Sequence, residues 1–78
     1  MIRVLLFAEL EERAGQRELE LNSNEMSVAE IRDWVKDNYP DASGIERAMA
    51  AVNEDYAEES TLVHTDDIIA FIPPVSGG

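Results

Sequence analysis

Residues 68–72 read Ile-Ile-Ala-Phe-Ile, and residues 4–7 near the other end of the chain read Val-Leu-Leu-Phe. Both runs are apolar at odd and at even positions, which is the pattern of a strand that is covered on both faces. A helix is expected between them, and parallel strands need such a crossover connection. The two ends of the chain therefore pair most economically as central, parallel neighbours of one sheet.

The crossover helix is expected to begin at Ser27, because Ser27 and Glu30 form a capping box in which each side chain binds the other residue's backbone N–H. The apolar stripe expected to lie on the sheet consists of Val28, Ile31 and Val35. The helix is expected to end at residues 38–40, Asn-Tyr-Pro, since the residue before a proline avoids helical geometry. Trp34, beside the stripe, is interpreted as a packing residue.

Shorter segments complete the expected topology. They are a helical turn over residues 10–13 closed by Gly15, a strand over 17–21, a strand over 49–52, and turns over 53–55 and 65–67. Residues 62–63 are too few to be assigned. The predicted class is α+β, a β-grasp in which a mixed sheet holds one main helix across one face. Its domain spans residues 1–72, and residues 73–78 form an extended tail.

Composition narrows the possible functions. The 78 residues include 17 Asp and Glu against 6 Lys and Arg, a formal charge of −11. Such a surface repels a phosphate backbone, so no nucleic-acid partner is expected. The acids are interpreted mainly as solvated surface, with attraction of a basic partner as the alternative. Cysteine is absent, which excludes disulfides and a thiol nucleophile.

Neither a membrane helix nor a signal peptide is expected. No stretch reaches the roughly 18 apolar residues that a membrane helix needs, and the first residues lack the long apolar region and cleavage site of a signal peptide. A cytoplasmic location is therefore predicted, with no membrane partner. His64 is the single histidine and is interpreted as structural, and no metal site is expected. The acidic runs at residues 9–12 and 54–59 are expected in turns, as solvated surface without a cleft.

The C-terminal tail carries the chemistry that a generic small domain lacks. Two prolines end the last strand and stiffen the chain, and two final glycines leave no side chain near the terminal carboxylate of Gly78. Two terminal glycines arise by chance in only about 0.5% of chains. The residues expected to thread a partner's narrow channel are Pro73, Pro74, Val75, Ser76 and Gly77.

The tail sequence also resembles a known family. Residues 71–78, Phe-Ile-Pro-Pro-Val-Ser-Gly-Gly, are similar to the C-terminal signature of the molybdopterin synthase small subunits, the MoaD branch of the MoaD/ThiS ubiquitin-like sulfur carriers. Residues 4–8 and 51–54 resemble that family's first strand and mid-chain turn. The turn at 65–67 departs from the family's common Asp-Gly-Asp, because Thr-Asp-Asp has no glycine.

The resemblance implies a function centred on Gly78. An E1-like enzyme would adenylate the Gly78 carboxylate with ATP, and a sulfur donor would then convert it to a thiocarboxylate. The larger synthase subunit would receive the tail, in an assembly that is 2:2 in the family, and sulfur would pass to the dithiolene of molybdopterin. The carrier would bind no cofactor and would have no catalytic side chain of its own.

Strand parity turns Val4, Leu6, Ile69 and Phe71 toward the helix and Phe7, Ile68 and Ile72 away from it. The resemblance implies that Phe7 and Ile72, joined by Tyr56, dock both partners.

Two alternatives from other classes stay open. The first is a ubiquitin-like modifier that is conjugated through Gly78 to lysines of target proteins. The second is a β-grasp adaptor whose exposed sheet binds partners and whose tail is inert.

Overall fold

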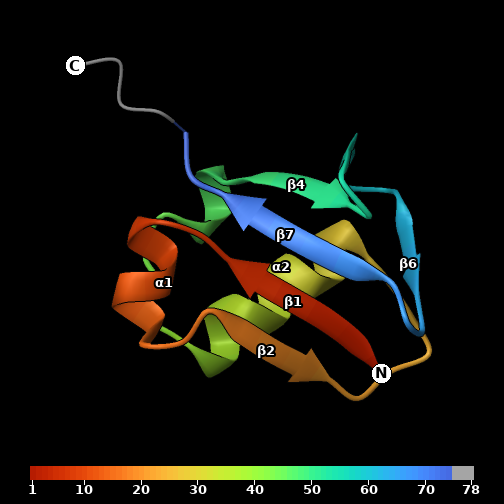
Figure 1. Ribbon diagram of the computed structural model, residues 1–78, viewed down its shortest axis with the longest axis horizontal. Helices are drawn as coiled ribbons and strands as arrows, with labels where there is room; N and C mark the ends of the chain where they lie inside the picture. Colours follow the sequence, from red (N-terminus) through yellow and green to blue (C-terminus); the bar gives the residue numbers. More distant parts are fainter. Residues whose placement is uncertain (75–78) are drawn as a thin grey trace.

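The computed structural model describes residues 1–74, and the predicted residues Val75, Ser76, Gly77 and Gly78 lie outside this described part. Its elements are β1 (Ile2–Leu6), α1 (Glu9–Ala14), β2 (Glu18–Leu21), β3 (Glu25–Ser27), α2 (Val28–Asn38), the 3-10 helix η1 (Ile45–Arg47), β4 (Met49–Val52), β5 (Asp55–Ala57), β6 (Leu62–His64) and β7 (Ile68–Ile72). Five strands form one sheet in the order β2-β1-β7-β4-β5, and β3 pairs with β6. Helix α2 crosses one face of the large sheet (Figure 1), so the β-grasp prediction is confirmed.

The two ends of the chain pair as predicted. Strands β1 and β7 run parallel in a register that matches Arg3 with Ile68 and Leu6 with Phe71, while β2 and β4 flank them in antiparallel orientation. The pair therefore sits inside the sheet with a neighbour on each outer side. The expectation that both faces are covered is corrected, because α2 covers only one face and the apolar residues on the other face, such as Phe7 and Ile72, stay exposed or half-buried.

Helix α2 begins and ends where the sequence predicts. The Ser27 hydroxyl accepts the Glu30 N–H at 3.1 Å, and a Glu30 carboxylate oxygen accepts the Ser27 N–H at 2.9 Å. Helical geometry stops at Asn38, one residue before Tyr39. Trp34 packs partly buried against the core, and its ring meets the Tyr39 ring edge-on with centroids 6.0 Å apart. Its interpretation as a packing residue is confirmed.

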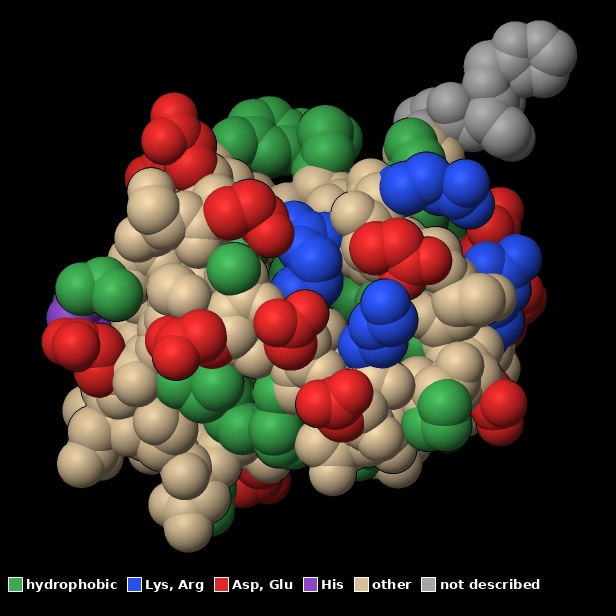
Figure 2. Space-filling model, turned by 180° about the vertical axis from the view of Figure 1, so that it is seen from behind, with side chains coloured by type: hydrophobic (Ala, Val, Ile, Leu, Met, Phe, Trp, Pro, Cys, Tyr) green, Lys and Arg blue, Asp and Glu red, His purple; other side chains and the backbone are tan. Residues whose placement is uncertain are grey.

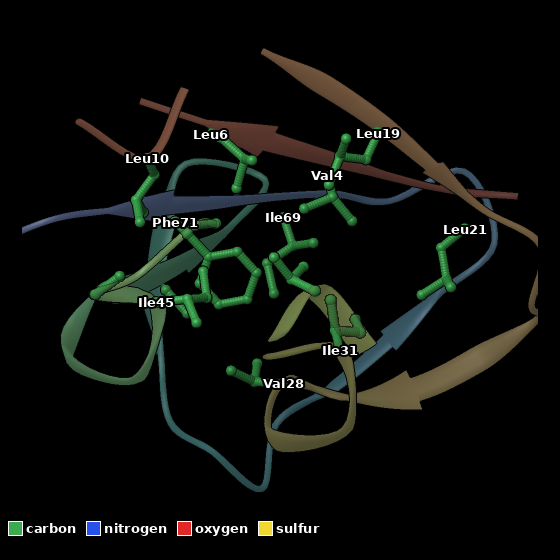
Figure 3. Packing of buried hydrophobic residues seen from close by; sticks show 14 of the residues in the cluster. Val4, Leu6, Leu10, Leu19, Leu21, Val28, Ile31, Ile45, Ile69 and Phe71 are labelled. Carbon is green, nitrogen blue, oxygen red and sulfur yellow. The ribbon is translucent and has the colours of Figure 1, made fainter. Parts of the chain in front are cut away.

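The core lies between α2 and the sheet (Figure 3). The four sheet residues predicted to face the helix are fully buried: Val4, Leu6, Ile69 and Phe71. The Arg32 guanidinium of α2 lies 5.2 Å from the centre of the Phe71 ring, and it donates to the carbonyl oxygens of Ile45 and Ala48 at 2.6 and 2.7 Å. Arg32 thus joins α2, η1 and the largest core side chain.

Three local expectations are corrected. Asp55 belongs to β5 and not to the preceding turn, which consists of Asn53 and Glu54 at φ of 50° and 75°. Positive φ at both central residues is the geometry of a two-residue hairpin, so the third residue of the expected turn, Asp55, is free to start β5. Residues 62–63, which the sequence leaves unassigned, belong to β6 (Leu62–His64), because β3 supplies a partner strand. The acidic run at 9–12 lies in α1, which ends at Gly15 with φ of 78°.

No helix within residues 1–74 is both long and apolar enough to cross a lipid bilayer.

Candidate functional site

A shallow groove of about 580 Å³ lies on the face of the sheet opposite α2. Its lining residues are Leu5, Phe7, Ala51, Asn53, Glu54, Tyr56, Ile68, Ala70 and Ile72. All three residues that the sequence predicts as a partner interface are among them. The Phe7 and Tyr56 side chains are 38% and 74% exposed, which is unusual for large rings. An apolar concavity of this kind is typical of a protein-docking site.

The register of the strands creates the groove. Along one row across the sheet, Leu5 of β1 pairs with Ala70 of β7, Ala70 pairs with Ala51 of β4, and Ala51 pairs with Tyr56 of β5. Two small alanine side chains therefore lie between two large side chains. The two alanines form the floor, and leucine and tyrosine form the walls. No pattern along the chain marks either alanine, because their pairing follows only from the order of the strands.

Ile72 and Phe7 lie at the end of the groove from which the tail leaves. The Phe7 N–H donates to the Phe71 carbonyl oxygen at 3.3 Å, which extends the parallel ladder by one residue beyond β1. Strand β7 ends at Ile72, and the next two residues are a half-buried Pro73 and an exposed Pro74. We call Pro73 and Pro74 the stem of the tail. A partner bound in the groove would therefore lie directly beside this stem.

The other end of the groove is held by Asn53. Its backbone N–H donates to the Ile68 carbonyl oxygen at 2.8 Å, and its side-chain oxygen accepts the Ile68 N–H at 3.0 Å. Its side-chain amide donates to the Asp67 carboxylate at 3.1 Å, and that carboxylate also accepts the His64 N–H at 2.8 Å. These bonds join the β4–β5 hairpin, which carries Tyr56, to the start of β7.

The Asp67 carboxylate gains from these bonds only while it is ionised. The hydrogen bond from the His64 backbone N–H, and then that from the Asn53 amide, hold the pKa of Asp67 below its ordinary value of 3.8. The folded state therefore releases this proton more readily than the unfolded state. The resulting stabilisation is present above the unfolded pKa and is lost as the pH falls through the folded pKa.

We expect wild-type protein to resist urea better than Asp67→Asn at neutral pH, and the difference to shrink steadily from about pH 5 to about pH 2. Urea unfolding followed by Trp34 fluorescence measures it. Asp41→Asn is the matched control, since Asp41 is an exposed loop residue with no side-chain hydrogen bond or ion pair within residues 1–74. A difference that stays constant over this pH range would show that Asp67 acts through its shape alone.

His64 lies away from the groove's apolar floor. Its Nε2 atom is 3.1 Å from a carboxylate oxygen of Glu25 across the β3–β6 pair, and both side chains are more than half exposed. Among the described residues, no group of three or more His, Asp or Glu side chains is arranged to hold a metal ion. The apolar groove among the described residues therefore supports a docking surface.

Comparison with known proteins identifies the family. Residues 4–78 match the profile of the ThiS family. The molybdopterin synthase sulfur carrier subunit of Arabidopsis thaliana is 34% identical over 79 residues, covering 99% of this chain and 82% of that protein. The protein of the same name from Dictyostelium discoideum is 33% identical over 81 residues, covering 97% of this chain and 94% of that protein.

Solved structures agree on the fold. The solution structure of the small archaeal modifier protein SAMP1 from Methanosarcina acetivorans has a TM-score of 0.79 at 29% identity, covering 99% of this chain and 95% of that one. A complex of subunits 1 and 2 of the molybdopterin-converting factor from Helicobacter pylori contains a chain with a TM-score of 0.64 at 20% identity, covering 99% and 97% of the two chains. Because the family match spans nearly the whole sequence, this chain belongs to the ThiS family of β-grasp proteins.

Proposed function

We propose that this chain is the sulfur-carrier subunit of a molybdopterin synthase and that Gly78 carries the sulfur as a C-terminal thiocarboxylate. The observation that carries the proposal is full-length similarity to two sulfur carrier subunits of that synthase. The Gly-Gly ending supports it, because a carboxylate without neighbouring side chains can enter a narrow active site. The groove supports it as well, since its tail end is Ile72, next to the stem.

The chemistry takes place at one carboxylate. An oxygen of the Gly78 carboxylate attacks the α-phosphate of ATP, pyrophosphate leaves, and an acyl adenylate forms. Hydrosulfide (HS⁻) supplied by a donor then attacks the carbonyl carbon, the C–O bond to AMP breaks, and the thiocarboxylate remains after its proton is lost to water. ATP belongs to the activating enzyme, and the carrier contributes position without a catalytic side chain of its own. An ATP-dependent cycle of this kind fits a cytoplasmic protein.

Two partners follow from this cycle, an E1-like adenylating enzyme and the larger synthase subunit. Both would cover the groove formed by Phe7, Tyr56, Ile72 and their neighbours, because both must reach the same terminus. Shared docking on one apolar surface makes the two complexes mutually exclusive. The expected assembly with the larger subunit is a 2:2 heterotetramer. In it, the carrier donates sulfur to the dithiolene of molybdopterin.

The direct test is the intact mass of the chain after incubation with the E1-like enzyme, ATP and a sulfur donor. The expected product carries one sulfur in place of one oxygen, and fragmentation places it on Gly78. Omitting ATP should prevent the mass change. An unchanged mass in the complete reaction, with the enzyme active on its own known carrier, would contradict the proposal.

The second candidate, a protein modifier, is favoured by one observation. The SAMP1 protein of M. acetivorans, whose name describes a small archaeal modifier, is 29% identical over nearly the whole chain. Attack of a target lysine amine on the same acyl adenylate would give an isopeptide bond. Digestion of cellular proteins would then yield lysines bearing a remnant of this tail. Their absence from cells that express the chain would leave sulfur transfer as its function.

A further inference from the structure

A second, smaller hollow of about 190 Å³ lies where the described chain ends. Its lining residues are Glu9, Leu10, Arg13, Ser43, Gly44, Arg47, Pro73 and Pro74. It is built by α1, by the segment that leads into η1, and by the stem of the tail. The groove and the hollow border the same stem, because Ile72 lines the groove and the next two residues line the hollow. A protein that covers the groove and receives the tail at Pro74 would therefore come close to the hollow as well.

The hollow concentrates positive charge in a strongly acidic molecule. The chain has 6 Lys and Arg against 17 Asp and Glu, yet two guanidinium groups, from Arg13 and Arg47, line this one site. In Figure 2, Lys and Arg side chains gather in the half of the visible face toward the end of the described chain, while Asp and Glu are spread over the whole face. The hollow is therefore a locally positive site on a molecule whose net charge is negative.

Local structure holds one of these groups in place and leaves the other available. Arg13 donates from Nη1 to the Ser43 carbonyl oxygen at 2.7 Å, and its Nη2 lies 3.5 Å from a carboxylate oxygen of Glu9. Gly44, at φ of 98°, brings its backbone close to this guanidinium, since a Cβ there would lie 3.4 Å from Nη1. Arg47 is exposed and has no carboxylate partner within residues 1–74.

We propose that this hollow, through Arg47 and Arg13, binds a carboxylate side chain of the E1-like enzyme at the rim of the channel through which that enzyme receives the tail. The inference rests on the proposed function and adds the chemistry of the partner's surface. Glu9 neutralises part of the positive charge, so about one unit of charge remains. One carboxylate balances this charge, whereas a phosphate dianion would leave about one unit of negative charge uncompensated beside Glu9.

The far end of the interface carries the opposite charge. Glu54 lines the groove beside Asn53, which is hydrogen-bonded to Ile68 at the start of β7, whereas Arg47 lies beside the stem at the end of β7. A partner with a basic group at one end and a carboxylate at the channel rim would fit in one orientation only. Charges arranged in this way select orientation and partner more than they raise affinity.

The test measures adenylation of Gly78 by the E1-like enzyme as pyrophosphate release, with the full-length chain as the varied substrate. Arg47→Glu should raise KM for the chain about tenfold and leave kcat within about twofold, because the change weakens binding and does not touch the reacting carboxylate. The loss should shrink at about 1 M salt, where the screening length falls to about 3 Å.

Lys36→Glu is the matched control, since it makes the same change in net charge on an exposed position of α2 outside the hollow. Its KM should stay within about twofold of wild type. Thermal unfolding of both variants checks that the fold is kept. Equal KM values for the two variants, or no effect of Arg47→Glu, would overturn the inference while wild-type activation still supports the proposed function. If the E1-like enzyme releases no pyrophosphate with the wild-type chain, both this inference and the proposed function are rejected.

Discussion

Removing Gly77 and Gly78 should abolish sulfur transfer while leaving the fold intact. The truncated chain still ends in a carboxylate, but that carboxylate is roughly 7 Å short of its position in the intact tail. Because a misplacement of about 1 Å can cost a hundredfold in rate, we expect thiocarboxylate formation to fall by at least about a thousandfold. Intact mass after reaction with the E1-like enzyme, ATP and a sulfur donor measures the loss.

Two control variants distinguish an effect of tail length from a general effect of changing the tail. Ser76→Ala keeps the length of the tail and should react at nearly the wild-type rate. A chain extended by one alanine beyond Gly78 should fail, since it puts a methyl group where the channel is expected to admit only glycine. Normal thiocarboxylate formation by the truncated chain would refute the requirement for Gly78 as the reacting residue.

Phe71→Ala should produce the largest loss of stability in the molecule. Phe71 is fully buried between the sheet and α2 and also lies under the Arg32 guanidinium. Truncating a buried phenylalanine costs about 3–5 kcal/mol, and a cation–π contact is lost as well. A domain of this size has a total stability of only about 4–12 kcal/mol. We therefore expect Tm to fall by at least about 12 °C, measured by thermal unfolding.

Ile72→Ala is the matched variant on the same strand. Ile72 points to the opposite face, where it is half-buried and lines the groove. Its truncation should lower stability by about 1 kcal/mol or less and should weaken binding of the larger synthase subunit about tenfold. The two variants, Phe71→Ala and Ile72→Ala, thus distinguish a loss of stability from a loss of partner binding. Unchanged binding by Ile72→Ala would show that the groove is not the interface, and equal losses of stability in the two variants would show that Ile72 acts as a core residue.

Several features of this fold could be predicted from short stretches of sequence. The capping box at Ser27 and Glu30 starts α2, and the alternation within 68–72 separates Phe71, in the core, from Ile72, in the groove. Such patterns need only neighbours within about one turn of helix or a few residues of strand. Strand β6 could not be found in this way, since three residues become a strand only through pairing with β3.

By itself, the sequence determined that the two ends of the chain pair, that one helix crosses the sheet, and that a side-chain-free terminus follows a proline stem. Only the tertiary structure decided that Ala70 and Ala51 lie side by side as a groove floor, and that Arg13 and Arg47 line one hollow beside Pro73 and Pro74. The reason is physical. Periodicity along a chain reports which way a side chain points, whereas lateral neighbours depend on strand order and register, which contacts between distant segments establish.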